Sequence, residues 1–214
     1  MSVAMFAFPS LSQANVIQNG DFATGDLTGW TLTFTQYGIP GIAPVVVPFD
    51  VTGTGTSNAA QFQVGVIGPH VGTGQQGLGL YQPITTGSGL YTFSAAIAVF
   101  DSSDPNSDAG NFTVMSDMTA VQPAVTYSFG QIATGETLRS SLSFTAPVSA
   151  GQHYIQILIT RGYNIPGGLY QYVTDISFDT PSSVTPLPAA LPLFATGLVG
   201  LGLLGWRRKK AAAG

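Results

Sequence analysis

The middle of the chain repeats one pattern, in which apolar and polar residues alternate over short segments separated by turn-forming residues. In WTLTFTQ, residues 30–36, the side chains of Trp30, Leu32 and Phe34 point to one side of an extended chain and the threonines to the other. A period of two is typical of a β-strand with one buried face. The segments AQFQVGV, LYTFSAAIAV and HYIQILIT repeat it.

Turn chemistry separates these segments. TGTGTSN, TTGSG, DSSDPNSDAG and NIPGG are rich in Gly, Pro, Asn, Asp and Ser, which favour turns. No stretch of the central region has a helical period with caps. About nine or ten short strands therefore predict an all-β, antiparallel β-sandwich of jelly-roll type over residues 15–180. Strands are expected in addition near 45–51, 78–84, 111–116, 124–129, 137–145 and 170–178.

The composition indicates a domain that is solvated mainly by uncharged polar groups. Only 7% of the 214 residues are charged, against roughly 25% in ordinary soluble proteins. The length is sufficient for one domain with a substantial core. Cysteine is absent, which excludes disulfides, thiol catalysis and thiolate metal sites. For an exported protein, this absence favours a bacterial origin.

The charges are distributed unevenly along the chain. Four of the six cations lie in the RRKK segment near the end, so that Arg139 and Arg161 face ten acidic residues, a net charge of −8 for the preceding region. Such a surface repels phosphate backbones and argues against nucleic-acid binding. Its carboxylates suit a hard cation such as Ca²⁺.

The C-terminal region contains an uncharged apolar segment from Leu187 to Trp206. As a helix it would be roughly 30 Å long, the thickness of a bilayer core. The cations that follow are expected to stay in the cytoplasm. The sequence predicts a linker with a sorting motif at 181–188, a single transmembrane-type helix at 189–206 and a basic cytoplasmic tail at 207–214, with the sandwich outside the cell.

The N-terminal segment has features of a signal peptide. An apolar stretch from Val3 to Phe8 precedes Ser12 and Ala14, small residues at the positions that signal peptidase prefers. A cationic start is missing. Residues 1–14 are therefore expected to be a truncated signal peptide.

The order of features in the C-terminal region resembles the PEP-CTERM sorting signal, in which a short proline motif precedes an apolar helix and a basic cluster. This chain has Leu187 where the family pattern has a glutamate between the prolines. The resemblance implies an exosortase-type processing enzyme as partner, a transient anchor in the inner membrane, and delivery to the cell surface or the extracellular space. The residues that carry it are Pro186, Leu187, Pro188, Trp206, Arg207 and Arg208.

A second resemblance covers most of the central region. NVIQNGDFATGDLTGWT, GLYQPITTGSGLYTFSAAIAV and YQYVTDISFD resemble, in this order, the first, middle and last strands of galactose-binding-like jelly-roll modules. The resemblance implies a structural Ca²⁺ between the N-terminal segment and the last strand, with Asp21 and Asp175 as ligands and Asn19 or Asp26 nearby. Alternatively, Asp21 and Asp26 only start turns and Asp175 marks a bulge.

Aromatic and polar residues around RGYNIPGGLYQY form a candidate carbohydrate site. Tyrosine rings can stack on the C–H faces of sugars, and charged or amide groups can bind the hydroxyls. In the alternative, the tyrosines fill the sandwich, because strands favour them. The candidate residues are Arg161, Tyr163, Asn164, Tyr170 and Tyr172.

Catalytic motifs are absent from the sequence. Neither His70 nor His153 lies in a nucleophile or metalloprotease motif, and Glu136 is the only glutamate. We therefore expect a protein that is not an enzyme, an exported surface or matrix β-sandwich with a structural or adhesive role in exopolysaccharide or biofilm. A Ca²⁺-stabilised, lectin-like carbohydrate-binding module is the first alternative, and a secreted hydrolase is the second.

Overall fold

The computed structural model describes residues 15–35, 38, 41–64, 76–102, 107–117, 125–161 and 168–180. The expected signal peptide, the linker with its sorting motif, the membrane helix and the basic tail lie outside the described residues. None of the described segments forms a helix with the length and apolarity of a membrane span.

The described residues form twelve strands. In chain order they are β1 (Thr31–Phe34), β2 (Val45–Phe49), β3 (Ser57–Phe62), β4 (Gln76–Thr86), β5 (Gly89–Asp101), β6 (Ser107–Asp108), β7 (Asn111–Ser116), β8 (Val125–Ser128), β9 (Gln131–Ile132), β10 (Thr137–Val148), β11 (Gly151–Arg161) and β12 (Leu169–Asp179). The short β6 lies in DSSDPNSDAG, which the sequence analysis marked as a turn or loop, and it pairs with β9.

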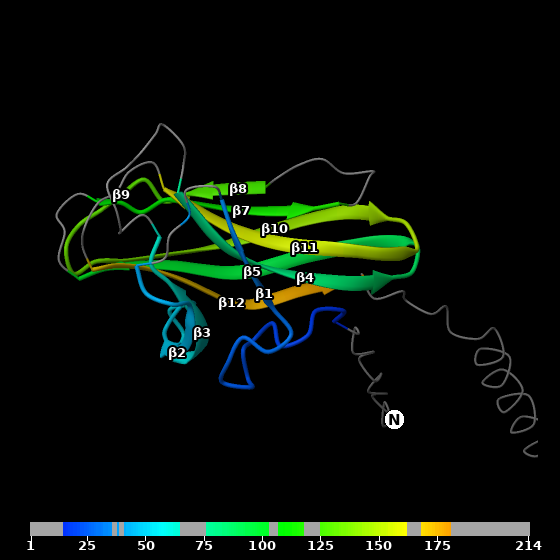
Figure 1. Ribbon diagram of the computed structural model, residues 1–214, viewed down its shortest axis with the longest axis horizontal. Coiled ribbons are helices and arrows are strands. Elements are labelled where there is room, and N and C mark those ends of the chain that lie inside the picture. Colours follow the sequence, from blue (N-terminus) through cyan, green and yellow to red (C-terminus); the bar gives the residue numbers. More distant parts are fainter. Residues whose placement is uncertain are drawn as a thin grey trace, which may run out of the picture. The chain divides into compact units, whose positions relative to one another are not determined.

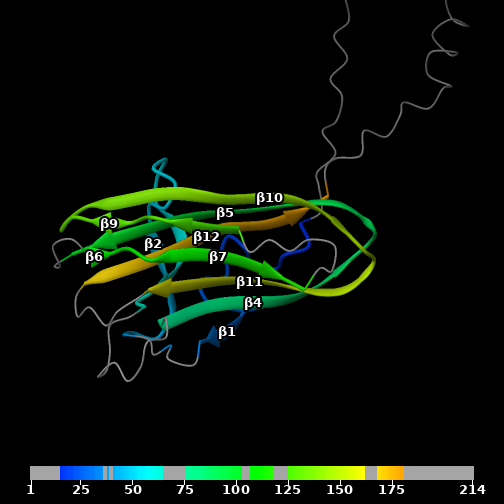
Figure 2. The ribbon, with the colours of Figure 1, turned by 90° about the horizontal axis from the view of Figure 1, so that it is seen from above.

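Two five-stranded sheets face each other (Figures 1 and 2). The first sheet has the order β1-β4-β11-β7-β8 and the second has the order β10-β5-β12-β3-β2. Figure 2 shows β10, β5 and β12 on one side and β11, β4 and β1 on the other. Neighbouring strands run antiparallel throughout the two sheets. The prediction of an all-β antiparallel sandwich is confirmed.

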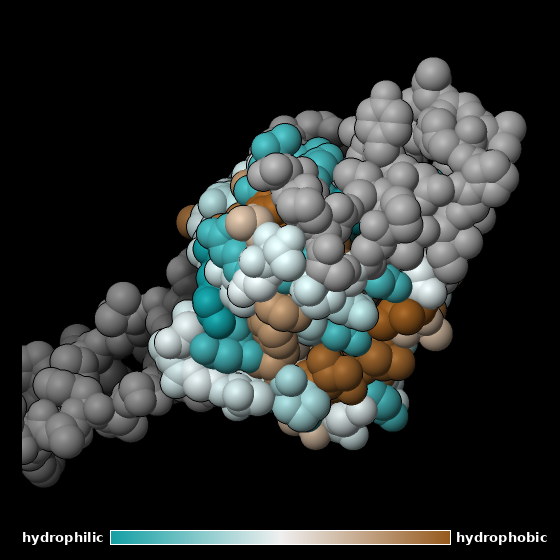
Figure 3. All heavy atoms as spheres, turned by 90° about the vertical axis from the view of Figure 1, so that its left-hand side faces the viewer, coloured by the Kyte–Doolittle hydropathy of each residue, from teal (hydrophilic) through white to brown (hydrophobic). Residues whose placement is uncertain are grey.

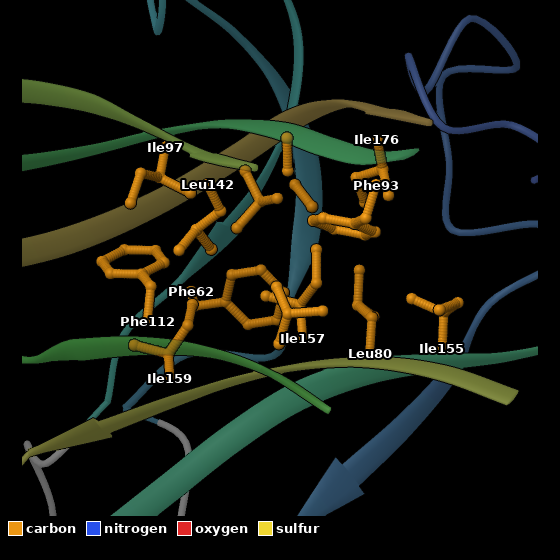
Figure 4. Packing of buried hydrophobic residues seen from close by; sticks show 14 of the residues in the cluster. Phe62, Leu80, Phe93, Ile97, Phe112, Leu142, Ile155, Ile157, Ile159 and Ile176 are labelled. Atoms are coloured by element: carbon orange, nitrogen blue, oxygen red, sulfur yellow. The ribbon is translucent and has the colours of Figure 1, made fainter. Parts of the chain in front are cut away.

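The core lies between the sheets and follows from the alternation in the sequence. Each strand sends every second side chain inward, where it meets those of the opposite sheet (Figure 4). Full burial of one such side chain contributes roughly 1.5–3 kcal/mol. Among the buried residues are Phe62, Phe93, Ile97 and Leu142 of the second sheet and Leu80, Phe112, Ile155, Ile157 and Ile159 of the first.

A second apolar cluster lies on the outer face of the second sheet. Val51, Ala59, Ala98 and Tyr172 are buried there, and Phe49 stacks on Tyr172 with ring centroids 3.7 Å apart. The alternation predicts a solvated outer face, and the cluster differs because Val47 and Phe49 of β2 and Val51 just after it add apolar side chains.

Uncharged polar residues supply much of the surface, as the composition predicts. Figure 3 views the sandwich from the left-hand side of Figure 1, and hydrophilic or neutral residues cover most of the coloured surface, with a hydrophobic patch between them.

Candidate functional site

The loop between residue 15 and β1 has a defined internal structure. Asn19 adopts a left-handed conformation, with φ of 51°, and its side-chain amide donates to the carbonyls of Asp26 and Thr28, both at 3.0 Å. Its own carbonyl accepts a hydrogen bond from the indole nitrogen of Trp30 at 3.0 Å. Trp30 is 8% exposed and packs against Phe22, so the indole is part of the core and also supports the loop.

This loop contacts the last strand at Gly20. The Gly20 carbonyl accepts a hydrogen bond from the amide of Ile176 at 2.9 Å. A Cβ at position 20 would collide with the carbonyl oxygen of Ile176, so this close approach requires glycine. The pairing of β12 with β5 shifts register between Thr174 and Ser177, and Asp175 in this bulge has a φ of 51°. The bulge turns the Asp175 side chain outward.

A hollow of about 450 Å³ lies where the loop meets the bulge, and both Asp21 and Asp175 line it. The two residues that the sequence proposed as metal ligands thus lie at one place, although 153 positions separate them in the chain. Asn15, Asn19 and the hydroxyls of Ser94 and Ser177 complete the polar part of the lining.

The aspartates of this loop also stabilise turns, as the alternative interpretation proposes. Oδ1 of Asp21 accepts from the amide of Ala23 at 3.1 Å. Oδ1 of Asp26 accepts from the amide of Thr28 at 2.9 Å and from the hydroxyl of Thr24 at 2.8 Å. These hydrogen bonds, that of the Thr28 amide first, lower the pKa of Asp26. Asp26 does not line the hollow.

The donor set of the hollow fits a hard cation. Carboxylates and carbonyl oxygens are ligands that Ca²⁺ accepts, and two aspartates line the hollow. The side-chain oxygens of Asn15 and Asn19 already accept hydrogen bonds from backbone amides. The described residues contain no cluster of three or more His, Cys, Asp or Glu side chains that could hold a metal. An ion here would need amide, carbonyl or water oxygens beside the two carboxylates.

The structure does not bring the described members of the predicted carbohydrate site together. Arg161 ends β11 on its inward face and is 1% exposed, with its guanidinium donating to the carbonyls of Val64 at 2.9 Å and Asp108 at 2.6 Å. Tyr170 and Tyr172 belong to the outer face of the other sheet. Tyr163, Asn164 and all six sorting-signal residues lie outside the described residues.

Tyr172 is a packing residue in this arrangement. It is 3% exposed, and its hydroxyl accepts a hydrogen bond from the Gln61 side chain at 2.9 Å. Phe49 covers a face of its ring. Burial raises the pKa of Tyr172 above its ordinary value of 10.0. Tyr170 is half-buried in the same cluster.

Two other tyrosines are exposed together on the outer face of the first sheet. Tyr81 of β4 is 37% exposed and Tyr154 of β11 is 39% exposed. Tyr81 pairs with Gln156 across the strands, and Tyr154 pairs with Pro83, so the tyrosines are diagonal neighbours about 7–8 Å apart at their backbones. We call Tyr81, Pro83, Tyr154 and Gln156 the tyrosine face.

The sequence analysis did not propose Tyr81 and Tyr154 as diagonal neighbours. Both lie at outward positions of alternating strands, next to the buried Leu80 and Ile155, and this signal was present in the sequence. The adjacency of β4 and β11 was not, because strand order depends on the whole fold.

His153 has a structural environment rather than that of a catalytic base. Its Nε2 lies 3.0 Å from the carbonyl oxygen of Ser149, and its Nδ1 lies 3.4 Å from the carboxylate of Asp117. Its side chain is 9% exposed.

Comparison with models of known protein families finds no match, and comparison with curated proteins finds none either. Solved structures do match. The chain is similar to the carbohydrate-binding module TmCBM61 in complex with β-1,4-galactotriose, with a TM-score of 0.52 and 14% identity, over 78% of this chain and 99% of that one. At 14% identity this likeness shows a shared β-sandwich fold.

Two further modules are similar in the same way. One is CBM28, a module specific for non-crystalline cellulose, with a TM-score of 0.47 and 12% identity over 79% of this chain and 97% of that one. The other is a family 16 carbohydrate-binding module, with a TM-score of 0.41 and 16% identity over 77% and 99%.

Proposed function

We propose that this chain is an exported, non-enzymatic carbohydrate-binding β-sandwich of jelly-roll type. The observation that carries this proposal is the exposed pair of Tyr81 and Tyr154 on the first sheet. The fold of the sandwich is similar to that of a module that was solved with bound galactotriose. This proposal favours the carbohydrate-binding alternative over a purely structural role in the matrix. Surface or biofilm association is the setting in which such binding would act.

The chemistry of the tyrosine face suits a sugar chain. Each half-exposed ring offers an apolar surface to the C–H groups of one pyranose while its hydroxyl remains solvated. Gln156 lies opposite Tyr81 and two residues after Tyr154, and its Nε2 donates to the hydroxyl of Thr33 at 3.4 Å. Its side-chain oxygen can accept from a sugar hydroxyl. Two rings on adjacent strands would contact two sugar units, so oligosaccharides should bind more tightly than monosaccharides.

We expect Tyr81→Ala and Tyr154→Ala each to weaken binding about tenfold, or about 1.4 kcal/mol, because each removes one stacking surface. Affinity electrophoresis in gels that contain neutral polysaccharides measures the change. Tyr170→Ala, on the opposite sheet, is the matched control and should leave retention unchanged. If Tyr170→Ala alone loses retention, the sugar site lies instead around RGYNIPGGLYQY, where the sequence analysis placed it.

We also propose a structural Ca²⁺ at the hollow. Asp21 and Asp175 would hold the ion, and Ca²⁺ would supply a cross-link between the N-terminal loop and β12. The support is the shared lining of one hollow by both carboxylates. The region that precedes the RRKK segment has a strong excess of acidic residues. A cation at the hollow would therefore also reduce the repulsion between carboxylates.

Removal of Ca²⁺ with EDTA is expected to lower the melting temperature. Free Ca²⁺ at about a hundred times its dissociation constant stabilises by about 2.7 kcal/mol, or about 5–10 °C for a domain of this size. Asp21→Asn and Asp175→Asn should abolish the response in differential scanning calorimetry. Asp179→Asn, also on β12 but not in the lining, should keep it. An unchanged melting temperature in EDTA would rule out the ion.

Export through a PEP-CTERM-like signal, transient anchoring in the inner membrane and processing by an exosortase-type enzyme remain part of the proposal. Their support is the sequence order of proline motif, apolar segment and basic cluster. Mass spectrometry of the extracellular form should find a chain that ends near Pro188. A soluble cytosolic form with an intact tail would contradict it.

A further inference from the structure

The outer face of the first sheet has little charge. Outward positions on its five strands alternate with the buried ones, and in the part of the chain that the structure describes they carry threonine, serine, tyrosine, glutamine, glycine, leucine, methionine, asparagine and proline. His153 and Arg161, the ionisable side chains of β11, belong to its inward-facing set.

One carboxylate, Asp117, borders the tyrosine face. It follows β7 directly, and its Oδ1 accepts a hydrogen bond from the backbone amide of Tyr154 at 3.0 Å. This bond fixes the carboxylate at the backbone of Tyr154, whose ring belongs to the proposed sugar site. The Asp117 side chain is 36% exposed, so a ligand that stacks on Tyr154 would meet it.

The two described arginines cannot offset this charge at the tyrosine face. Arg161 is buried in the core. Arg139 lies on β10 of the other sheet, where its guanidinium is 3.4 Å from the carboxylate of Asp50. The ionisable group that lies against Asp117 is His153, whose Nδ1 is 3.4 Å from Oδ1 and which offsets the charge only when the imidazole is protonated. With a neutral imidazole, a ligand on the tyrosine face meets a negative group and two neutral, aromatic ones.

We infer that Asp117 is a specificity-determining residue that makes the tyrosine face selective for neutral glycans and rejects acidic ones. The inference rests on the proposed carbohydrate-binding function. A neutral pyranose can donate its hydroxyls to the carboxylate, which gives charge-assisted hydrogen bonds. A uronic acid brings a second negative charge into the same region, and like charges in a binding interface are unfavourable.

The test compares two oligosaccharides that share ring configuration and linkage and differ in the group at C5, β-1,4-mannotetraose and β-1,4-tetramannuronate. A panel of β-1,4-galactotriose, cellotetraose and xylotetraose is titrated beside them. Binding to the full-length chain is measured by isothermal titration calorimetry and by changes in chemical shift. The buffer is kept at about pH 8, where an imidazole is ordinarily neutral, and at low ionic strength.

At low ionic strength the neutral glycan that binds best should bind about tenfold more tightly than tetramannuronate. Asp117→Asn keeps an oxygen acceptor for the Tyr154 amide and removes the charge. It should raise the affinity for tetramannuronate about threefold, and about 0.5 M salt should remove most of this gain. Asp179→Asn makes the same change of net charge on the opposite sheet and should alter the affinity by less than about 1.5-fold.

The outcomes separate this inference from the proposed function. Neutral binding that depends on Tyr81 and Tyr154, with equal affinity for tetramannuronate or no response to Asp117→Asn, overturns the role of Asp117 and leaves carbohydrate binding in place. An equal response to Asp117→Asn and Asp179→Asn assigns the effect to net charge and also overturns it. If no oligosaccharide of the panel binds, the proposed function fails, and the inference fails with it.

Discussion

Replacing Arg161 by methionine is expected to lower the free energy of unfolding by about 3–5 kcal/mol, because it removes two hydrogen bonds from a buried cation to backbone carbonyls, each worth about 1.5–3 kcal/mol. The guanidinium donates to the carbonyl oxygens of Val64 and Asp108, and the residue is 1% exposed. Methionine fills part of the volume and donates nothing, so both carbonyls lose a charged donor. Equilibrium urea unfolding, followed by tryptophan fluorescence, measures the loss.

Arg139→Met is the matched control for this substitution. Arg139 also donates to a carbonyl, that of Asp50, and forms an ion pair with the same residue, but its side chain is 36% exposed. An exposed pair of this kind is worth less than about 1 kcal/mol. Equal losses in the two variants would contradict the structural role of Arg161. If Arg161→Met does not fold, Arg161→Lys, which keeps a charge but not the fork of donors, should still show a measurable loss.

Trp30→Ala is expected to cost about 3–5 kcal/mol, because it leaves a large cavity next to Phe22. It also removes the hydrogen bond from the indole to the Asn19 carbonyl, at the residue whose left-handed conformation shapes the N-terminal loop. Two effects are therefore expected from one substitution, a loss of stability and a looser hollow. Urea unfolding measures the first, and the Ca²⁺-dependent shift in melting temperature measures the second.

Trp30→Phe separates the two contributions. Phenylalanine keeps most of the packing and loses the hydrogen bond, which is worth about 1 kcal/mol. It should reduce the response to Ca²⁺ more than another core substitution of similar cost, such as Ile97→Val in β5, which does not line the hollow. If both variants respond to Ca²⁺ like the unmodified chain, Trp30 contributes to the core alone.

Much of the sandwich was predictable because β-strands have a simple period. The alternation in LYTFSAAIAV indicated that Phe93, Ile97 and Val99 share a face, and all three are buried. The same alternation in HYIQILITR places Arg161 on the face of Ile155, Ile157 and Ile159. The sequence analysis named Arg161 as a member of the candidate carbohydrate site, whereas the residue is 1% exposed, in agreement with this alternation.

The two candidate sites could be predicted from the sequence to different degrees. Asp21 and Asp175 were proposed from motif resemblance, and the structure places both at one hollow. The contact includes the hydrogen bond from the Ile176 amide to the Gly20 carbonyl, which no local pattern reports. Tyr172 could not be judged from its strand, because the ring that covers it belongs to Phe49 in a distant segment.

The sequence by itself determined which segments are strands and which side chains share a face, because extended chains alternate with a period of two whatever lies beside them. Only the tertiary structure decided which outward faces stay open. On the second sheet Phe49 of β2 covers Tyr172, and on the first sheet Tyr81 and Tyr154 remain exposed as diagonal neighbours. The physical reason is that cover and neighbour come from residues far away in the chain, and their position depends on the folding of the whole domain.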